Sequence, residues 1–379
     1  MTTAMQEQLE GSTPHILSQT PDALIRQIGE MGQPAFRARQ LVDWLFQKRI
    51  SDPDRMSNLP ASFRTQLRDS FDWSLPGIVS RLDSEDGASK LLLRDAKGMQ
   101  FEAVILRYEG RTSLCVSSQV GCKLACRFCQ TGKLGFFRHL RADEIIAQFM
   151  LANQLLESEE RRISHVVFMG MGEPLDNPDS VLAAVRLLTS PDAFGLSYRR
   201  VTVSTSGLVP GIMRLADKSL CSLAVSLHAA RDELRTELMP VNRKYPLAEL
   251  KEALLFWQKQ TGQRITIEYI LIRDKNATRR EAKELVRFLH GLRAKVNLIP
   301  FNPHPGLEYQ RPALREIEDF QSYLSARGYP SPVRYSKGME VSAACGQLAA
   351  KHQESIFSAP LRRNVVTASG LPGTSSRLS

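Results

Sequence analysis

The pattern of hydrophobic and polar positions divides the chain into a helical start and a longer stretch in which strands and helices alternate. In residues 21–70, apolar side chains such as Phe36, Leu41 and Leu45 recur at helical spacing, with lysines and arginines on the other faces. This segment predicts a small basic helical domain. Residues 1–20 are polar and aperiodic, and they predict a loose arm.

From about residue 89 the pattern changes to short apolar runs that are typical of strands. Two paired strands are expected at 90–94 and 100–106, and later strands at 113–119, 165–169, 200–205, 221–227, 264–272, 295–301 and 332–335. Helices are expected at 142–157, 178–189, 246–257, 279–291 and 313–327. Such alternation implies parallel strands joined by right-handed crossovers. An α/β fold with a full or partial βα barrel therefore fits best, and an open doubly wound sheet is the alternative.

These changes of pattern also set the expected domain boundaries. Residues 1–78 are expected to form the helical accessory domain, and residues 79–355 the α/β catalytic domain. Residues 356–379 are rich in Ser, Gly, Pro and Arg, a composition that predicts a disordered tail.

Charge and composition narrow the class of protein. No apolar run approaches the roughly 18 residues of a membrane span, and the start of the chain lacks the basic and apolar regions of a secretory signal. We therefore expect a cytoplasmic protein whose six cysteines serve metal or catalytic chemistry and not a disulfide scaffold. The formal charge of +10 favours a polyanionic partner such as nucleic acid.

Three cysteines, Cys122, Cys126 and Cys129, form a CxxxCxxC motif. Three thiolates this close can bind three irons of a 4Fe–4S cluster and leave the fourth iron open for another ligand, such as S-adenosylmethionine (SAM). A zinc knuckle with a distant fourth ligand is the alternative. His139 lies ten residues downstream without a second CxxC, which is poor zinc spacing.

Several predicted strands end in glycines or polar side chains, and in βα barrels the chemistry lies at these ends. The candidate residues at the strand ends are Gly172, Glu173, Ser204, Ser226, His228 and Asn302. A lone histidine at a strand end is more often structural, so the argument rests on their occurrence together. They predict a SAM pocket next to the cysteine motif.

Two further cysteines stand near these features. Cys345 lies in a loop of small residues after the last predicted strand, where its sulfur is expected to make few packing contacts. Cys115 precedes the CxxxCxxC motif within a predicted strand, and by itself it reads as a core cysteine. Cys221, at a strand start without a motif, is assigned to the core.

Seven motifs make the sequence resemble the RlmN/Cfr family of radical-SAM adenosine methyltransferases. They are SSQVGC (117–122) leading into the cysteine motif, MGMGEPL (169–175), VSTSGL (203–208), SLH (226–228), LMPVN (238–242), NLIPFN (297–302) and AACGQL (343–348). The start of the chain around 32–40 also looks like the accessory domain of this family. The resemblance covers most of residues 20–350 and leaves out 356–379.

The resemblance implies a partial barrel of the radical-SAM type, with one 4Fe–4S cluster on Cys122, Cys126 and Cys129 and two SAM molecules used per turnover. Cys345 takes a methyl group from one SAM, and the reduced cluster cleaves the second SAM to a 5′-deoxyadenosyl radical. That radical removes a hydrogen atom from the Cys345 methyl group, which then adds to carbon 2 of an adenine.

The resemblance also assigns the remaining roles. Cys115 attacks the sulfur of Cys345, which releases the product and leaves a transient disulfide. Glu102 is the base that takes the ring proton. The implied SAM-binding residues are Gly172, Glu173, Ser204, Ser226, Leu227, His228 and Asn302.

The implied substrates are an adenosine in the peptidyl-transferase region of 23S rRNA and an adenosine beside the anticodon of some tRNAs. Such bases must be unstacked to reach a buried radical. The basic residues that flank the cysteine motif are expected to hold phosphates as a group; they are Lys123, Arg127, Lys133 and Arg138. By the same analogy we expect a monomer that does not contact a membrane. We also expect it to receive its electrons from a flavodoxin-type partner.

Two alternatives stay open at this point. The Cfr branch methylates carbon 8 of the same rRNA adenosine and confers antibiotic resistance, and it shares all of these motifs; the sequence is most like the RlmN branch. A non-enzymatic, metal-containing RNA-binding protein would need neither SAM nor Cys345.

Overall fold

Nine strands form the main sheet of the computed structural model, which describes residues 13–218, 220–303 and 306–348. In order across the sheet they are β1 (Gly77–Asp83), β2 (Ala88–Arg94), β3 (Gln100–Tyr108), β4 (Arg111–Cys115), β7 (His165–Phe168), β8 (Val201–Thr205), β9 (Ser222–Ser226), β10 (Ile265–Leu271) and β11 (Ala294–Pro300). Pairs from β1 to β4 are antiparallel, and pairs from β4 to β11 are parallel.

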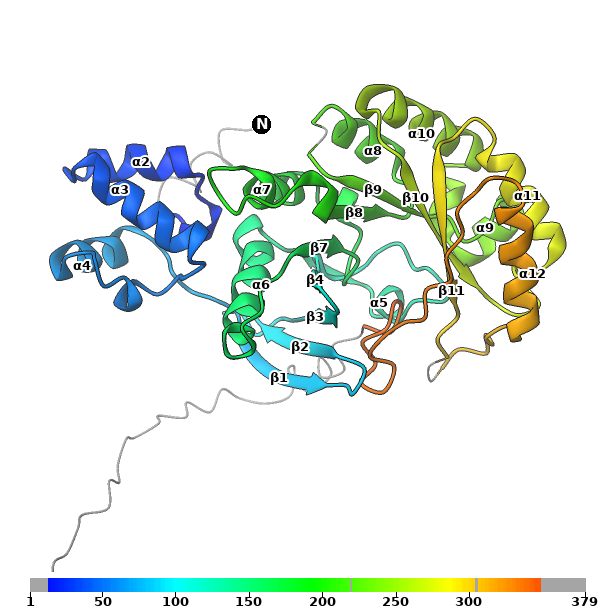
Figure 1. The fold of residues 1–379 in the computed structure, drawn as a ribbon, viewed down its shortest axis with the longest axis horizontal. Helices are drawn as coiled ribbons and strands as arrows, with labels where there is room; N and C mark the ends of the chain where they lie inside the picture. The colour runs from blue at the N-terminus through cyan, green and yellow to red at the C-terminus, as the bar shows by residue number, and fades with distance from the viewer. Residues whose placement is uncertain (1–12, 219, 304–305, 349–379) are drawn as a thin grey trace, which may run out of the picture.

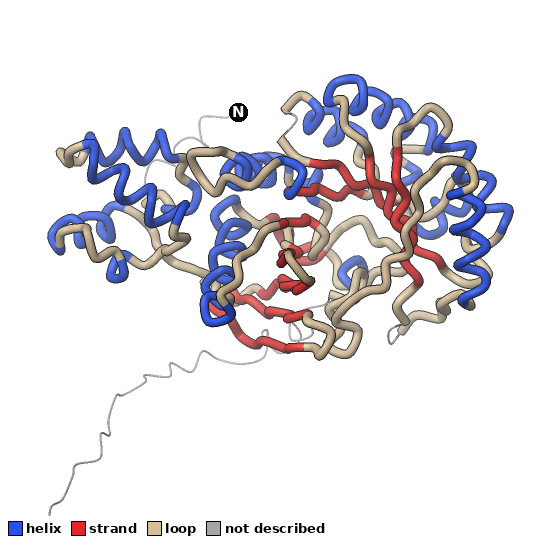
Figure 2. The backbone as a smooth tube through the Cα atoms, in the orientation of Figure 1, coloured by secondary structure: helices blue, strands red, loops and turns tan. Residues whose placement is uncertain are grey.

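The helices that connect the parallel strands pack around the outside of the curved sheet (Figures 1 and 2). They are α6 (Ala142–Leu155), α7 (Pro178–Thr189), α8 (Val209–Ala216), α10 (Leu247–Thr261) and α11 (Arg279–Leu289), and α12 (Leu314–Ser325) follows the last strand. Parallel strands need such crossovers, and both of their faces are then buried. Within the described residues β1 and β11 do not pair with each other, so the barrel is partial. The predicted partial barrel is confirmed, and the doubly wound sheet does not fit.

The helical start packs beside α6 and α7 as a small domain (Figure 1). Its helices are α2 (Pro21–Glu30), α3 (Ala35–Val42) and α4 (Ala61–Ser70). Thr20 begins α2, because its side-chain oxygen accepts a hydrogen bond from the backbone N–H of Ala23. Leu24, Leu41 and Phe63 are buried between the helices.

The expectation of a loose arm over residues 1–20 is wrong for its described part. Ile16 and Leu17 are buried, and His15 bridges to Asp72 after α4. Two adjacent apolar residues are enough to anchor the segment, although they form no periodic pattern. The rest of the arm and the tail at 356–379 lie outside the described residues.

Two predicted strands differ in the structure. The run 113–119 ends as β4 at Cys115, and β5 (Gln119–Gly121) forms a separate hairpin with β6 (Phe136–His139). The run 332–335 makes only an isolated bridge between Val333 and Leu298. Prolines explain the second case, because Pro330 and Pro332 accept hydrogen bonds from β11 but have no N–H to return.

Candidate active site

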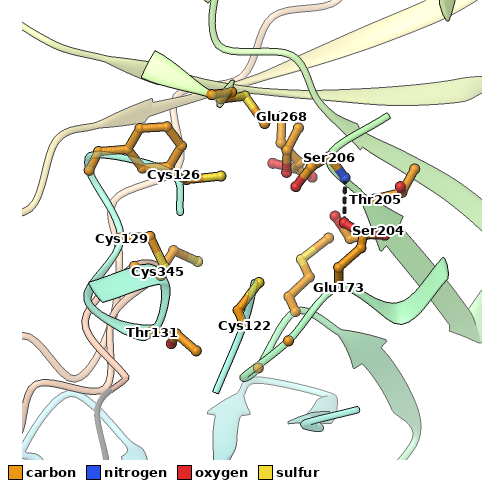
Figure 3. Close-up of a pocket in the computed structure, with 18 of the residues that line it drawn as sticks. Cys122, Cys126, Cys129, Thr131, Glu173, Ser204, Thr205, Ser206, Glu268 and Cys345 are labelled. Carbon is orange, nitrogen blue, oxygen red and sulfur yellow. Dashed lines mark hydrogen bonds between the residues drawn. The ribbon is translucent and has the colours of Figure 1, made fainter. Parts of the chain in front are cut away.

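A pocket lies at the carboxyl ends of the parallel strands (Figure 3). It brings together nine of the residues proposed from the sequence, namely Cys122, Cys126, Cys129, Gly172, Glu173, Ser204, Ser226, His228 and Cys345. These residues come from loops and strand ends that are far apart along the chain. Their meeting at one edge follows from the parallel sheet, which places every strand's carboxyl end on the same side.

The loop that carries the three cysteines is fixed by backbone hydrogen bonds. The N–H of Cys122 donates to Gly135 at 2.8 Å, and the N–H of Arg127 donates to Leu238 at 3.0 Å. A Cβ on Gly121 would lie 2.0 Å from the oxygen of Gly135, so the hairpin requires glycine there. The short helix α5 (Gln130–Lys133) follows Cys129 and closes the loop.

The chemistry of the three thiols fits a cluster better than a single metal ion. The three thiols line the same pocket and are joined there by an open space and not by a fourth cysteine of the motif. A zinc knuckle needs all its ligands around one atom, whereas each cysteine of an iron–sulfur cluster binds a different iron. Burial raises the pKa of Cys122 to about 12, so metal binding there must release a proton.

The glycine-rich turn after β7 presents Glu173 to the pocket. Gly172 has a φ of +100°, and a Cβ there would lie 2.5 Å from the Cβ of Gln119. Glu173 is buried, and its carboxylate accepts hydrogen bonds from the N–H groups of Leu175 at 3.1 Å and Ser206 at 2.8 Å (Figure 3). Burial raises the pKa of this carboxyl group. The carboxylate is therefore fixed in place and costly to ionise until a cation or a donor meets it.

His228 lines the pocket and also has a structural role. The residue adopts a φ of 58°, and its Nδ1 accepts a hydrogen bond from the N–H of Ile270 at 3.1 Å. Burial lowers the pKa of His228 to about 3, so the ring is neutral at ordinary pH.

Two of the residues proposed for SAM binding do not line the pocket. Leu227 is fully buried. Asn302 is engaged with its neighbours, because its amide donates to Ser336 Oγ at 2.8 Å and accepts from Arg311 at 3.0 Å. The backbone of Leu227 is engaged as well, because its N–H donates to the oxygen of Glu268 at 3.1 Å and its oxygen accepts from Arg235 Nε at 3.2 Å.

Cys345 reaches the pocket from a loop that is tied to α5. The N–H of Gln130 donates to the oxygen of Gly346 at 2.8 Å, and Thr131 Oγ1 donates to the oxygen of Leu348 at 2.6 Å. Figure 3 shows Cys345 on the same side of the pocket as Cys129. The Cys345 side chain is exposed to the open space of the pocket, yet the surrounding protein removes enough water to raise its pKa to about 11.

Cys115 and Glu102 stand behind this loop and do not line the pocket. Cys115 ends β4, and its thiol is close enough to Cys345 for the two to interact electrostatically; burial is the larger reason that the pKa of Cys115 is raised. Both thiols are free. Glu102 is buried on β3 and pairs with Lys90 at 3.4 Å, while Lys90 Nζ also donates to the oxygen of Ser342 at 3.4 Å.

Sequence reasoning missed Glu268, which lines the same pocket from β10. Its carboxylate accepts a hydrogen bond from Asn297 Nδ2 at 2.9 Å, and burial raises its pKa. One signal was available, because Glu268 is the single charged residue in the strand Ile265–Leu271. An acid in a parallel strand, where both faces are buried, marks a functional candidate.

The basic residues around the cysteine motif are largely engaged with the protein itself. Lys123 pairs with Asp176 at 2.6 Å, and Arg138 pairs with Asp95 and, at 2.7 Å, with Glu144. Lys133 donates to the oxygen of Gly306 at 2.5 Å. A phosphate that binds at these side chains must therefore compete with internal partners.

A partial βα barrel with three cysteines and a glycine-rich turn at one end defines a radical-SAM enzyme, and comparison with known proteins agrees. The model of the radical SAM superfamily matches residues 116–289, and that of the ribosomal RNA large subunit methyltransferase N-terminal domain matches residues 15–72. A crystal structure of a radical SAM methyltransferase from Sphaerobacter thermophilus superposes with a TM-score of 0.85 and 41% identity, over 88% of this chain and 99% of that one.

Sequence relatives narrow the family. The dual-specificity RNA methyltransferase RlmN of Syntrophobacter fumaroxidans is 46% identical, over 85% of this chain and 94% of the relative. The protein of the same name from Agrobacterium fabrum is 41% identical, over 90% of this chain and 89% of the relative. The chain belongs to the RlmN family of radical-SAM RNA methyltransferases. Among its described helices, none has the length and apolar character needed to cross a membrane.

Proposed function

We propose that this protein methylates carbon 2 of two RNA adenosines, one in the peptidyl-transferase region of 23S rRNA and one next to the anticodon of some tRNAs. The observation that carries the proposal is that Cys345 and the three cysteines of the CxxxCxxC loop line one pocket. Relatives named dual-specificity RNA methyltransferase RlmN support the choice of substrates. A non-enzymatic RNA-binding protein has no use for this arrangement.

The residues of the pocket divide into two binding sets. Cys122, Cys126 and Cys129 would hold a 4Fe–4S cluster. Gly172, Glu173, Ser204, Ser226 and His228 would contact SAM from the wall of the pocket, and Leu227 and Asn302 would support that wall from behind it. When bound, these groups supply a carbon radical that removes a hydrogen atom from a methyl group. Glu173 is suited to accept from the amino group of SAM, because its buried carboxylate is already fixed by two backbone donors.

Cys345 is the proposed methyl carrier. Its thiol loses a proton, and its sulfur attacks the methyl carbon of a first SAM. With a pKa of about 11 the thiol is protonated in the free pocket, so the positive charge of SAM must favour its ionisation. The exposed position of the side chain leaves room for the extra methyl group and for an adenine ring.

Cys115 and Glu102 are proposed to complete the reaction from behind the loop. Cys115 would attack the Cys345 sulfur, forming an S–S bond as the C–S bond to the product breaks. Glu102 would take the proton from the adenine ring. Lys90 Nζ lies 3.4 Å from this carboxyl group and holds it in place, and a carboxylate is a group that can act as a general base.

The rest of the molecule is proposed to serve substrate delivery. Residues 1–78 would form the RNA-contacting accessory domain and residues 79–355 the catalytic domain. The protein would act as a cytoplasmic monomer that receives electrons from a flavodoxin-type partner. RNA binding would weaken as salt rises, because phosphate contacts release counterions.

The test is to incubate the anaerobically reconstituted protein with SAM, a reductant and a protein-free rRNA fragment, and to identify methyladenosines by mass spectrometry. We expect 2-methyladenosine, which disappears in Cys345→Ala. Cys221→Ala is the control, because Cys221 is buried in the core away from the pocket. Finding 8-methyladenosine would move the protein to the Cfr type of activity, and finding no methyladenosine would overturn the proposal.

A further inference from the structure

Arg235 is a fully buried cation beside the pocket. It lies on α9 (Asp232–Leu238) and is 0% exposed. Its guanidinium donates to the backbone oxygens of Ser206 at 2.7 Å and Leu227 at 3.2 Å, and to Asn242 Oδ1 at 2.8 Å. The side chain thus connects the ends of β8 and β9 to the segment that follows α9.

All of these acceptors are neutral. In the part of the chain that the structure describes, no carboxylate oxygen lies within 4.0 Å of the guanidinium. Asp232 makes no direct contact with the guanidinium but interacts with it electrostatically. Asn242 links the two residues, because its Nδ2 donates to Asp232 Oδ1 at 2.8 Å. Burial lowers the pKa of Arg235 to about 10, so it still carries its charge at neutral pH.

A buried charge without a counterion is expensive, typically several kcal/mol. Besides Asp232, the thiol of Cys126 interacts electrostatically with Arg235, and this cysteine forms part of the three-cysteine loop. The backbone bond from Arg127 to Leu238 holds this loop against α9. The positive charge therefore faces the place where thiolates form when metal binds.

We propose that Arg235 is a positioning residue that supplies fixed positive charge to the three-cysteine centre and thereby makes its reduction easier. The inference rests on the proposed function of these cysteines. One electron enters the centre from a low-potential one-electron donor, and no bond is made or broken by Arg235. The same guanidinium also donates hydrogen bonds to Ser206 and Leu227. Arg235 therefore contacts the proposed SAM-binding side of the pocket as well as acting on the three-cysteine loop.

Two substitutions separate charge from hydrogen bonding. Arg235→Gln keeps an amide donor and removes the charge, whereas Arg235→Lys keeps the charge and loses the planar fork. Each reconstituted full-length variant is titrated anaerobically with dithionite and mediators, and the reduced centre is followed by electron paramagnetic resonance. Iron and sulfide content are measured on the same samples.

At a given potential we expect the ratio of reduced to oxidised centre in Arg235→Gln to fall at least about tenfold, which is about 59 mV for one electron. Arg235→Lys should titrate close to the wild type. Arg214→Met, which removes an exposed arginine of α8, is the matched control and should cause no shift. If the iron-replete Gln and Lys variants titrate at the same potential, the charge has no role and Arg235 is only structural.

A second variant keeps the proposal testable if Arg235→Gln does not assemble its metal. The exchange variant Asp232→Asn/Asn242→Asp moves the carboxylate from position 232 to position 242, next to the guanidinium, and keeps an amide facing a carboxylate between these two positions. It offsets the charge of Arg235 while that residue stays in place. We expect it to lower the reduced fraction as well, and an unchanged titration would overturn the proposal. A wild type that binds no iron and sulfide would instead refute the proposed function of the cysteines, independently of Arg235.

Discussion

A single ring nitrogen fixes the protonation state of His228. Its Nδ1 accepts the N–H of Ile270, and this bond is lost if the ring gains a second proton. Because burial depresses the pKa to about 3, the folded protein resists a proton that the unfolded chain takes near pH 6.5. The stability that this site contributes is complete above pH 6.5 and is lost as the pH falls toward 3.

We therefore expect the free energy of unfolding of His228→Asn to fall less than that of the wild type as the pH is lowered. Asn tolerates the left-handed backbone and offers an oxygen to Ile270. Between pH 6.5 and pH 5 the metal-free wild type should lose about 2 kcal/mol more than the variant. Urea unfolding at both pH values measures the difference, and parallel profiles would contradict the assignment of a neutral buried ring.

Glu268 should behave in the opposite sense. Burial raises its folded pKa, so the folded protein binds a proton more readily than the unfolded chain, and stability falls as the pH rises through and above the ordinary carboxyl pKa. Glu268→Gln keeps an oxygen for Asn297 and removes the charge. We expect the variant without ligand to be more stable than the wild type at pH 8 and equal to it at pH 4, as measured by urea unfolding.

At the scale of elements, the turn after β7 depends on close packing as well as on backbone conformation. Gly172→Ala meets both a positive φ and the side chain of Gln119, whereas Gly291→Ala meets a φ of +82° with nothing within 4 Å. The control should cost about 1 to 2 kcal/mol from its backbone alone. Gly172→Ala should lower the stability clearly more than Gly291→Ala, as measured by thermal unfolding, and it should weaken SAM binding, as measured by calorimetry. Equal losses of stability in the two variants would show that the turn can accommodate a Cβ at position 172.

The pattern of apolar residues predicted most elements, and the exceptions have local causes. Helix α7 lies where it was expected, because its apolar spacing and its opening proline agree. The short helix α9 was not predicted, because only seven residues carry its pattern. Strand β1 was not predicted either, since Ile78, Val79 and Leu82 are all exposed and show no alternation between buried and polar positions.

The residues of the candidate site could likewise be predicted only where the local sequence is unusual. Residues in loops with unusual composition, such as Cys345 and Glu173, were visible in the sequence. Arg235 was not, because it stands in the ordinary helical sequence DELRTEL and its burial depends on contacts with two distant strands. Asn302 belongs to a recognisable motif but does not line the pocket, because Arg311 and Ser336 form hydrogen bonds with its side-chain amide.

At the scale of the whole molecule, a row of edge-to-face aromatic contacts joins the accessory domain to the barrel. The ring of Phe46 lies 5.1 Å from that of Phe194, which lies 4.9 Å from Phe149 on α6. Arg49 adds a hydrogen bond of 2.6 Å to Asn153. These contacts make the two parts one packed unit.

Phe46→Ala should therefore release the accessory domain. Removing a buried phenyl ring costs about 3 to 5 kcal/mol, and much of that loss falls on the contact between the domains. We expect faster proteolytic cleavage between α4 and β1 and a separate unfolding transition. Phe36→Ala, at a side chain that is 51% exposed, is the control and should behave as the wild type.

The two hydrogen bonds between α5 and the Cys345 loop have a consequence for the order of assembly. Gln130 and Thr131 directly follow Cys129, so the segment that carries the proposed cluster ligands is also the segment that holds residues 346 and 348. Ordering one loop lowers the entropic cost of ordering the other. Under the proposed function, maturation with iron and sulfide would therefore also order the loop that carries Cys345, and a chain without its cluster would hold that sulfur less firmly.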